Sequence, residues 1–165
     1  MQEHTYDINT LIEYDIILGA FYLKKNSKIV RRIFPTEEGY LIFFRDCCRL
    51  KLRANKVAIQ IVTGEIIPKS KAILHKNLDE NDYRLQNLKI ISKISYNKVK
   101  EAYRNLSGAL KMLPHNSDVF SYVISWKEDN KEKKTVVSDI VIAKRIYAKL
   151  ELKYAKILNK YCVFD

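Results

Sequence analysis

The sequence has few cysteines and no long apolar segment. Its three cysteines, Cys47, Cys48 and Cys162, are an odd number and none stands in C-x-x-C spacing. This pattern argues against a disulfide framework or a zinc site, so we expect reduced cysteines that pack as small apolar groups. No run of residues is long and apolar enough for a membrane helix, and the first residues lack a secretory pattern. We therefore expect an intracellular, soluble protein with no membrane partner.

Acidic residues are scarce relative to basic ones. The 165 residues include 30 Lys and Arg against 19 Asp and Glu, a formal net charge of +11. Such an excess attracts polyanions, nucleic acid first, because each cation placed on a phosphate releases a condensed counterion. The basic residues recur throughout the chain and alternate with eleven tyrosines, which can stack or hydrogen-bond. The alternative is a lysine-rich surface that only keeps the protein soluble.

Residues 39–53, GYLIFFRDCCRLKLR, predict a β-hairpin with arms at 40–44 and 49–53. In the second arm two leucines alternate with three cations, so we expect a half-buried strand with a basic outer face. The three cations of that face are Arg49, Lys51 and Arg53.

The segments beside the hairpin predict a strand and a helix. Residues 7–15 indicate a short helical or irregular segment, and 19–25 indicate a strand of aromatic and apolar residues after a glycine. After the hairpin, apolar residues recur at helical spacing from Asn55 onward, and Gly64 is placed to end that helix.

Residues 73–92, ILHKNLDENDYRLQNLKIIS, predict two strands joined by a polar loop rich in Asn and Asp. The strands are expected at 72–74 and 88–91. A helix is expected over 95–106, with Ser95 as its cap. Strand, polar loop, strand and helix is the order of a ββα unit.

The last third of the chain predicts a small sheet with one helix packed on it. Residues 119–127 and 133–138 indicate two strands joined by a charged turn, and a long helix follows, with Ser138 as its cap and Asp139 in its first turn. We place a domain boundary after residue 106, which gives domains 1–106 and 107–165.

Alternation along the first of these strands has a consequence for its side chains. It places Tyr122, Ile124 and Trp126 on one face and the intervening residues, including Lys127, on the other. Only one of the two faces can be buried in a sheet with a single covering helix.

With these elements placed, the chain resembles phage-type HNH homing endonucleases along nearly its whole length. The upstream blocks YDIILGAFYLKK, GYLIFF and TGEIIP fall where that family has a leading strand, a Gly-Tyr hairpin and a Gly-x-x-Pro turn, and the segment around YVISWK looks like an Apetala-type DNA-binding domain. The residues matching the family's strand–loop–strand–helix pattern are His75, Asn77, Asp79, Asp82, Arg84, Asn87, Leu88 and Asn97.

The resemblance implies an α+β fold. Its core would be an HNH-like ββα-metal unit, preceded by a β-hairpin region and followed by a small three-stranded sheet with a helix. His75 would be the general base, Asn97 a metal ligand, and Asn87 the residue that braces the loop. The cofactor would be Mg²⁺ if the centre is active, and none otherwise. The expected DNA contacts are Arg49, Lys51, Arg53, Arg84, Tyr122, Lys127, Lys131, Lys133 and Lys134.

The chain departs from the family pattern at three positions. Leu74 stands where the family has an Asp that binds metal, Asn55 where a histidine is common, and Tyr83 where an Asn is usual. Leucine offers no oxygen, so the cation would lose its charged ligand. The alternative is that His75 only packs or hydrogen-bonds, and that Asn97 only bonds a nearby backbone group of its helix.

Three hypotheses for function follow from this pattern. The first is a DNA-binding protein with an HNH homing-endonuclease scaffold, cleavage lost or weak, that occupies double-stranded DNA sites as a regulator or competitor. The second is an active divalent-metal-dependent endonuclease that nicks or cuts DNA. The third is a phage-encoded inhibitor that binds a protein of the host. In each case the expected location is the cytoplasm, that of the bacterial host if a phage encodes the chain.

Overall fold

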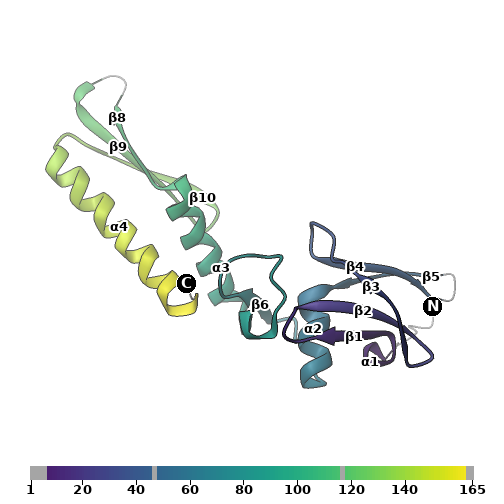
Figure 1. Cartoon of the computed structure of the whole chain (residues 1–165). Helices are drawn as coiled ribbons and strands as arrows, with labels where there is room; N and C mark the ends of the chain where they lie inside the picture. Colours follow the sequence, from purple (N-terminus) through teal and green to yellow (C-terminus); the bar gives the residue numbers. More distant parts are fainter. Residues whose placement is uncertain (1–6, 46–47, 116–117, 163–165) are drawn as a thin grey trace. The chain divides into compact units, whose positions relative to one another are not determined.

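The computed structural model describes residues 7–45, 48–115 and 118–162 (Figure 1). The fold is α+β, with helices and several small antiparallel sheets. The chain divides into two compact units, whose described parts lie within 7–92 (unit 1) and 93–162 (unit 2). Helix α3 (Lys93–Arg104), which the sequence analysis assigns to the first expected domain, belongs to unit 2.

Unit 1 begins with the short helix α1 (Ile8–Leu11) and a three-stranded meander. Its strands are β1 (Ile12–Asp15), β2 (Ala20–Lys25) and β3 (Lys28–Ile33), in the order β1-β2-β3. The β2–β3 turn consists of two residues with φ of 50° and 62°, as a type I′ hairpin requires. The strand expected at 19–25 is thereby confirmed, whereas β3 was not expected.

The predicted hairpin is confirmed as β4 (Tyr40–Arg45) and β5 (Cys48–Arg53), which pair antiparallel with Tyr40 opposite Arg53. Helix α2 (Ala54–Thr63) follows directly. It ends as predicted at Gly64, which has a φ of 72° and donates its N–H to the carbonyl of Gln60.

The expected strand–loop–strand segment forms β6 (Lys71–His75) and β7 (Leu88–Ser92), with a 3₁₀ turn η1 (Leu85–Asn87) before β7. The two strands pair antiparallel, with His75 opposite Leu88. Together with the meander, the hairpin and α2 they surround one core. Its largest members buried to 2% exposure or less are Leu11, Ile12, Phe21, Leu41 and Phe43.

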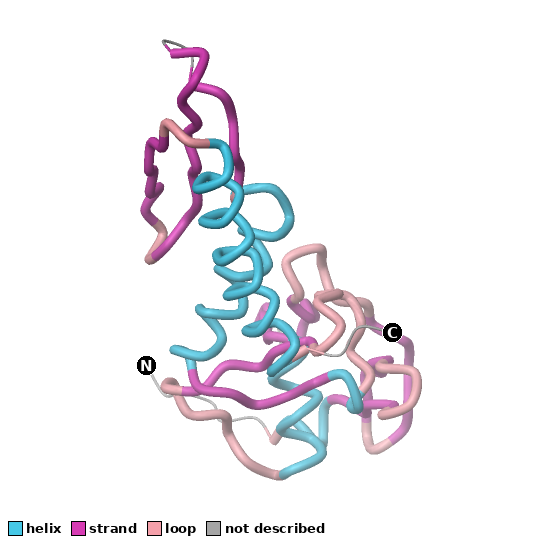
Figure 2. Tube along the Cα trace, turned by 90° about the vertical axis from the view of Figure 1, so that its left-hand side faces the viewer, coloured by secondary structure: helices cyan, strands magenta, loops and turns pink. Residues whose placement is uncertain are grey.

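Unit 2 contains α3, a π-helical turn η2 (Asn105–Ala109), and three strands followed by a long helix. The strands are β8 (Lys111–His115), β9 (Asp118–Glu128) and β10 (Lys131–Val137), in the order β10-β9-β8, and α4 (Ile140–Tyr161) follows. Figure 2 shows α4 running beside α3 and along the sheet. The buried cluster between α4 and the sheet is built on Leu110, Ile124 and Ala143.

Two predicted helix starts are wrong. Ser95 lies inside α3 and is not its cap, because α3 begins directly after β7. Asp139, not Ser138, caps α4: its backbone is extended and its carboxylate accepts hydrogen bonds from the N–H groups of Val141 and Ile142. A carboxylate at that position also suits the helix dipole. Every helix in the described part of the chain is too short or too polar to be a membrane-spanning segment.

Gly19, between β1 and β2, lies against the polar loop 76–87. Its φ is 64°, and a Cβ at this position would lie 2.6 Å from the backbone nitrogen of Arg84 and 2.7 Å from the carbonyl carbon of Tyr83. Gly64 has a similar φ of 72°, but a Cβ there would meet no atom within 4 Å. Alanine substitutions at the two positions therefore distinguish the free-energy cost of a left-handed backbone from the cost of a steric clash.

We predict that Gly19→Ala lowers the free energy of unfolding by roughly 2–5 kcal/mol, the sum of left-handed strain and overpacking. Gly64→Ala, the matched control, should cost only about 1–2 kcal/mol, because it adds strain without a clash. Urea unfolding followed by circular dichroism measures both. Equal losses in the two variants would contradict the close packing of Gly19 on the loop.

Candidate functional site

The acidic and amide side chains of the loop 76–87 mostly bond to the loop itself. Asn77 Oδ1 accepts the N–H of Asp79 (3.0 Å), and Asp79 Oδ1 accepts the N–H of Asn81 (2.9 Å). Asp82 Oδ1 accepts the N–H of Arg84 (3.1 Å). These oxygens stabilise turns, as Asn and Asp side chains often do in such loops. They already accept backbone hydrogen bonds and are therefore less suited to bind a metal ion.

Arg84 is bound to Asp82. Its Nε lies 2.9 Å from Asp82 Oδ1, and its Nη2 forms an ion pair with Oδ2. The guanidinium holds the pKa of Asp82 below its usual value, and a bond from Asn77 Nδ2 to Oδ2 (2.9 Å) acts in the same direction. Arg84 stays about half exposed, but a DNA phosphate would have to share it with this carboxylate.

The carboxamide of Asn87 joins the two sides of the loop. Its Oδ1 accepts the N–H of Asn77 and its Nδ2 donates to the carbonyl of Asp82, both at 2.9 Å. The side chain is buried, with 6% of the residue exposed. Asn87 therefore bonds to loop backbone at two points that are five residues apart.

Tyr83 fixes the loop to the core of unit 1. Its ring makes edge contacts with Phe21 (5.7 Å between centroids) and with the imidazole of His75 (5.5 Å). Its carbonyl accepts the buried hydroxyl of Tyr14, whose pKa burial raises to about 12, so that it remains a donor. From the sequence, Tyr83 was only a departure from a family pattern. The structure uses it as a packing residue.

His75 and Leu74 lie on opposite faces of β6. His75 shares its face with Ile73, which belongs to the unit 1 core, and only 8% of His75 is exposed. Leu74 is 3% exposed and presents only hydrocarbon. A general base must come within hydrogen-bond reach of the water it activates, and the packing of this ring against Tyr83 does not favour that.

Asn97 lies on α3, in unit 2, where it lines a groove between α3 and α4. Its neighbours along the groove include Lys98, Lys156 and Lys160, whose charges favour an anion over a cation. No group of three or more His, Cys, Asp or Glu residues suited to a metal ion occurs within the described residues. The donors at His75 and Asn97 therefore do not fit a resident Mg²⁺.

Asn55, at the position where the family commonly has a histidine, is the second residue of α2 and supplies no imidazole.

The outer face of the β4–β5 hairpin carries cations and aromatic rings. Its cross-strand pairs are Tyr40 with Arg53, Ile42 with Lys51, and Phe44 with Arg49. The cations are exposed, as predicted from alternation, and Phe44 is 70% exposed. Lys51 Nζ and Arg53 Cζ each lie 4.0 Å from the centroid of the Tyr40 ring, so these cations stack on an aromatic face.

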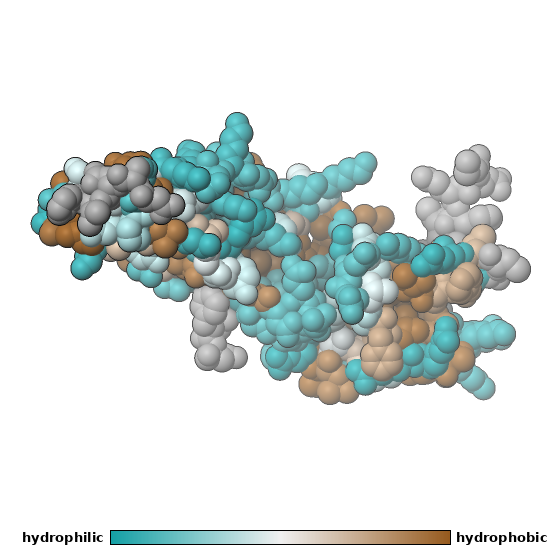
Figure 3. All heavy atoms as spheres, turned by 90° about the horizontal axis from the view of Figure 1, so that it is seen from above, coloured by the Kyte–Doolittle hydropathy of each residue, from teal (hydrophilic) through white to brown (hydrophobic). Residues whose placement is uncertain are grey.

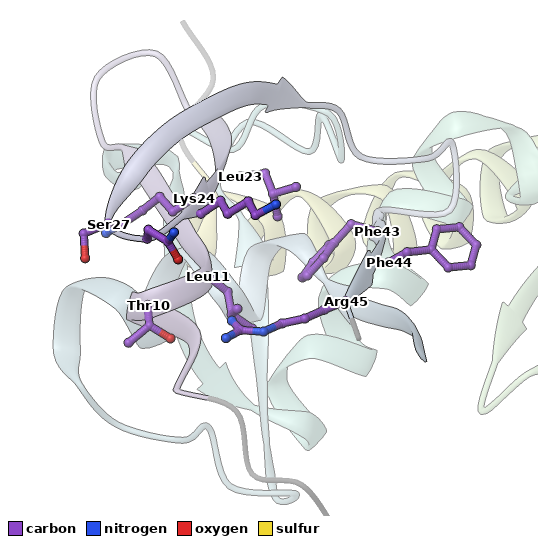
Figure 4. Close-up of a pocket in the computed structure, with 10 residues that line it drawn as sticks. Thr10, Leu11, Leu23, Lys24, Ser27, Phe43, Phe44 and Arg45 are labelled. Atoms are coloured by element: carbon purple, nitrogen blue, oxygen red, sulfur yellow. The ribbon is translucent and has the colours of Figure 1, made fainter. Parts of the chain in front are cut away.

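A pocket of about 480 Å³ opens beside this hairpin, between α1, the end of β2 and the end of β4. In Figure 4 the Phe43 ring and the Arg45 side chain point toward Leu11, whereas Phe44 points away from them. Lys24 and Lys25 add two more cations, and none of the described residues that line the pocket is acidic. The pocket suits an anionic group, and it lies on the side of the hairpin to which Phe43 points, opposite the basic outer face.

The sheet of unit 2 has one covered and one open face. Tyr122 and Trp126 pack toward α4 with Ile124, so Tyr122 lies on the covered side. The cross-strand register then defines the open face. Its residues are Lys111, Leu113, Val123, Ser125, Lys127, Glu132, Lys134 and Val136.

Three lysines of the open face, Lys111, Lys127 and Lys134, are exposed. Buried Asn105 fixes the backbone at Lys127 by accepting its N–H (2.8 Å) and donating to its carbonyl (2.7 Å). Lys111 and Asn105 were not among the residues expected from the sequence. The alternation of apolar and polar residues in LKM, 110–112, was the available signal for the strand that carries Lys111.

The other predicted lysines of unit 2 differ in their surroundings. Lys131 is exposed at the start of β10. Lys133 bonds to Glu128, which also bonds to Lys153 (2.7 Å). Hydrogen bonds from these two lysines lower the pKa of Glu128 to about 2. Lys133 is therefore engaged by a carboxylate, whereas Lys111 and Lys127 of the open face form no ion pair with any residue that the structure describes.

Comparisons of the chain with protein-family models, with curated proteins and with solved structures give no match. The roles proposed below therefore depend on contacts, burial and charge. The basic surfaces described above are the features on which these roles depend. Figure 3 shows from one side how hydrophilic and hydrophobic residues are distributed over the described part of the chain.

We predict that Asn87→Ala destabilises the protein by roughly 2–4 kcal/mol, because it leaves the N–H of Asn77 and the carbonyl of Asp82 without their buried partner. Asn81→Ala is the control, because Asn81 is exposed in the same loop and should change stability by no more than about 0.5 kcal/mol. Urea unfolding midpoints measure the difference. Similar midpoints for the two variants would mean that Asn87 does not brace the loop.

Proposed function

We propose that the protein binds double-stranded DNA through the open face of the β8–β9–β10 sheet and acts by occupying DNA sites. The observation that carries this proposal is a three-stranded sheet with α4 on one face and exposed lysines on the other. Each lysine placed on a phosphate releases a counterion, which makes such a face attractive to a duplex.

The arrangement of the open face suits a DNA groove. Lys111, Ser125 and Lys134 lie directly opposite one another on three neighbouring strands. Three strands span about 10 Å, close to the major-groove width of about 12 Å. The outer lysines would then reach phosphates on either side, with the Ser125 hydroxyl toward base edges. The exposed apolar residues Leu113 and Val136 could contact thymine methyl groups.

In this proposal the chain has an HNH homing-endonuclease scaffold and an Apetala-type DNA-binding domain, with cleavage lost or weak. The order β6, polar loop, β7 and α3 along the chain supports the first resemblance, and the three-stranded sheet with α4 supports the second. The loss of cleavage is supported by Leu74 at the position of the acidic ligand, by the packing of His75, and by the lysines around Asn97.

The β4–β5 hairpin supplies a second proposed DNA contact. Arg49, Lys51 and Arg53 alternate along one strand at intervals of about 6.7 Å, so they can meet successive phosphates. Phe44, exposed opposite Arg49, can contact a sugar or a base. These residues lie in unit 1 and can be tested separately from the sheet.

We predict that the triple variant Lys111→Gln, Lys127→Gln, Lys134→Gln weakens duplex binding. It should reduce the slope of log K against log salt by about 3, one per lost phosphate contact. The control is Lys144→Gln, Arg145→Gln, Lys149→Gln, which removes the same charge from α4 outside the open face and the α3–α4 groove. Fluorescence anisotropy over a KCl series measures both slopes. If the control variant lost as much duplex affinity and as much of its salt slope as the triple variant, the open face would be refuted as the DNA-binding surface.

We also predict that a supercoiled plasmid stays intact when incubated with the protein and Mg²⁺ or Mn²⁺. The physical reason is the missing charged ligand at Leu74. Agarose gels over a time course measure nicked and linear products, with an EDTA-treated sample as reference. Nicking that EDTA abolishes and that His75→Gln removes would instead establish an active metal-dependent nuclease.

A further inference from the structure

Unit 2 has a second basic surface, the groove between α3 and α4. The groove has a volume of about 960 Å³. Six cations from the two helices line it, against three acidic residues. The cations are Lys98, Lys100 and Arg104 of α3, and Lys153, Lys156 and Lys160 of α4.

The acidic residues gather at one end of the groove. Glu128 bonds to Lys153 and Lys133, and Glu101 accepts the N–H of Asp129 (2.8 Å). Arg104 bonds at the same end to the side chain of Asn130 (3.1 Å). The charges at this end are largely compensated within the protein.

The other end of the groove is cationic. There the Tyr161 hydroxyl meets Ser95 Oγ (3.2 Å), which joins the end of α4 to the start of α3. Lys98, Lys156 and Lys160 line this end, and no acidic residue does so within the described part of the chain. The contact with Ser95, together with the charges of Lys160 and Lys98, holds the pKa of Tyr161 below its usual value.

We propose that this groove holds the phosphodiester backbone of a second nucleic-acid segment. Lys156 and Lys160, neither of which bonds to the carboxylates of the compensated end, follow one another along α4 at an interval of about 6 Å, a spacing that suits successive phosphates more than a single anion. Lys98 supplies charge from the facing helix. Most residues that line the groove are charged, with Ile94, Ile157 and Tyr161 as its apolar and aromatic members, whereas pockets for drug-like ligands are lined mainly by apolar and aromatic side chains.

The groove and the open face lie on opposite sides of the sheet. Glu128 lines the groove. It lies two residues after Trp126 in β9, so both side chains are on the face of the sheet that α4 covers. Lys127, the residue between them, points to the open side. One copy of unit 2 would thus bridge two DNA segments. The bridging inference depends on the proposed function for the open face, whereas the groove itself does not.

The test is a bridging assay on the full chain. One biotinylated duplex is immobilised on beads, the protein is bound to saturation, and a fluorescent duplex of the same sequence is added. We expect capture of the second duplex, and we expect Lys98→Gln, Lys156→Gln, Lys160→Gln to reduce this capture at least about tenfold while binding to the first duplex persists. The control Lys144→Gln, Arg145→Gln, Lys149→Gln carries the same charge change and should capture normally.

Each other outcome points to a different failure. No binding to the first duplex would refute the proposed function. Binding of the first duplex without capture of the second would refute the bridging inference alone. Capture that survives the groove variant would also refute it, because some other surface or a dimer would then bridge. Equal loss of both steps in the groove variant would show that the groove and the open face are not separate sites.

Discussion

Each sheet in the described part of the chain has only two or three strands, so one covering layer is enough to bury one of its faces. Period-two alternation then determines which side chains reach solvent. In β4–β5 the burial of Leu41 and Phe43 leaves Arg49, Lys51 and Arg53 on the outside. In β8–β10 the packing of Ile124 and its neighbours on α4 leaves a row of lysines exposed. The same contacts that stabilise the core therefore place the cations together on open faces.

In the polar loop 76–87, residues beside His75 serve packing and loop structure instead of binding a metal ion. Tyr83 lies within the loop, yet its ring is 5% exposed and contacts Phe21 and His75. The loop also bonds its own carboxylates and amides, and Asn87 joins its two sides. All these contacts stabilise the loop without a metal ion. A scaffold of this kind can keep its shape when the charged ligand is absent, which is compatible with the proposed loss of cleavage.

Local patterns in the sequence were sufficient for part of the fold and of the site. The hairpin, the end of α2 at Gly64 and the exposed cations of β5 follow from alternation and from one glycine. Strand β3 was missed because five of its six residues are exposed, which removes the alternating signal. Alternation could not say which face of β9 is buried, so the covered position of Tyr122 required the contacts with α4. The bond of Lys153 to Glu128 and the anchoring by Tyr83 join residues far apart in the chain, and no local pattern encodes such contacts.

A surface that only maintains solubility usually mixes charges of both signs, since interspersed charges avoid mutual repulsion. Unit 2 is arranged differently. Glu128 is placed between Lys133 and Lys153, and its pKa near 2 keeps it charged across the physiological range. Glu128 thus neutralises cations at one end of the groove between α3 and α4. Among the ion pairs of the described residues, the cations at the other end of this groove have no acidic partner. The same holds for two of the three open-face lysines. Cations held close together on folded elements repel one another, and a bound polyanion relieves that repulsion. The charge distribution thus supports the proposed binding of phosphates over a purely solubilising role.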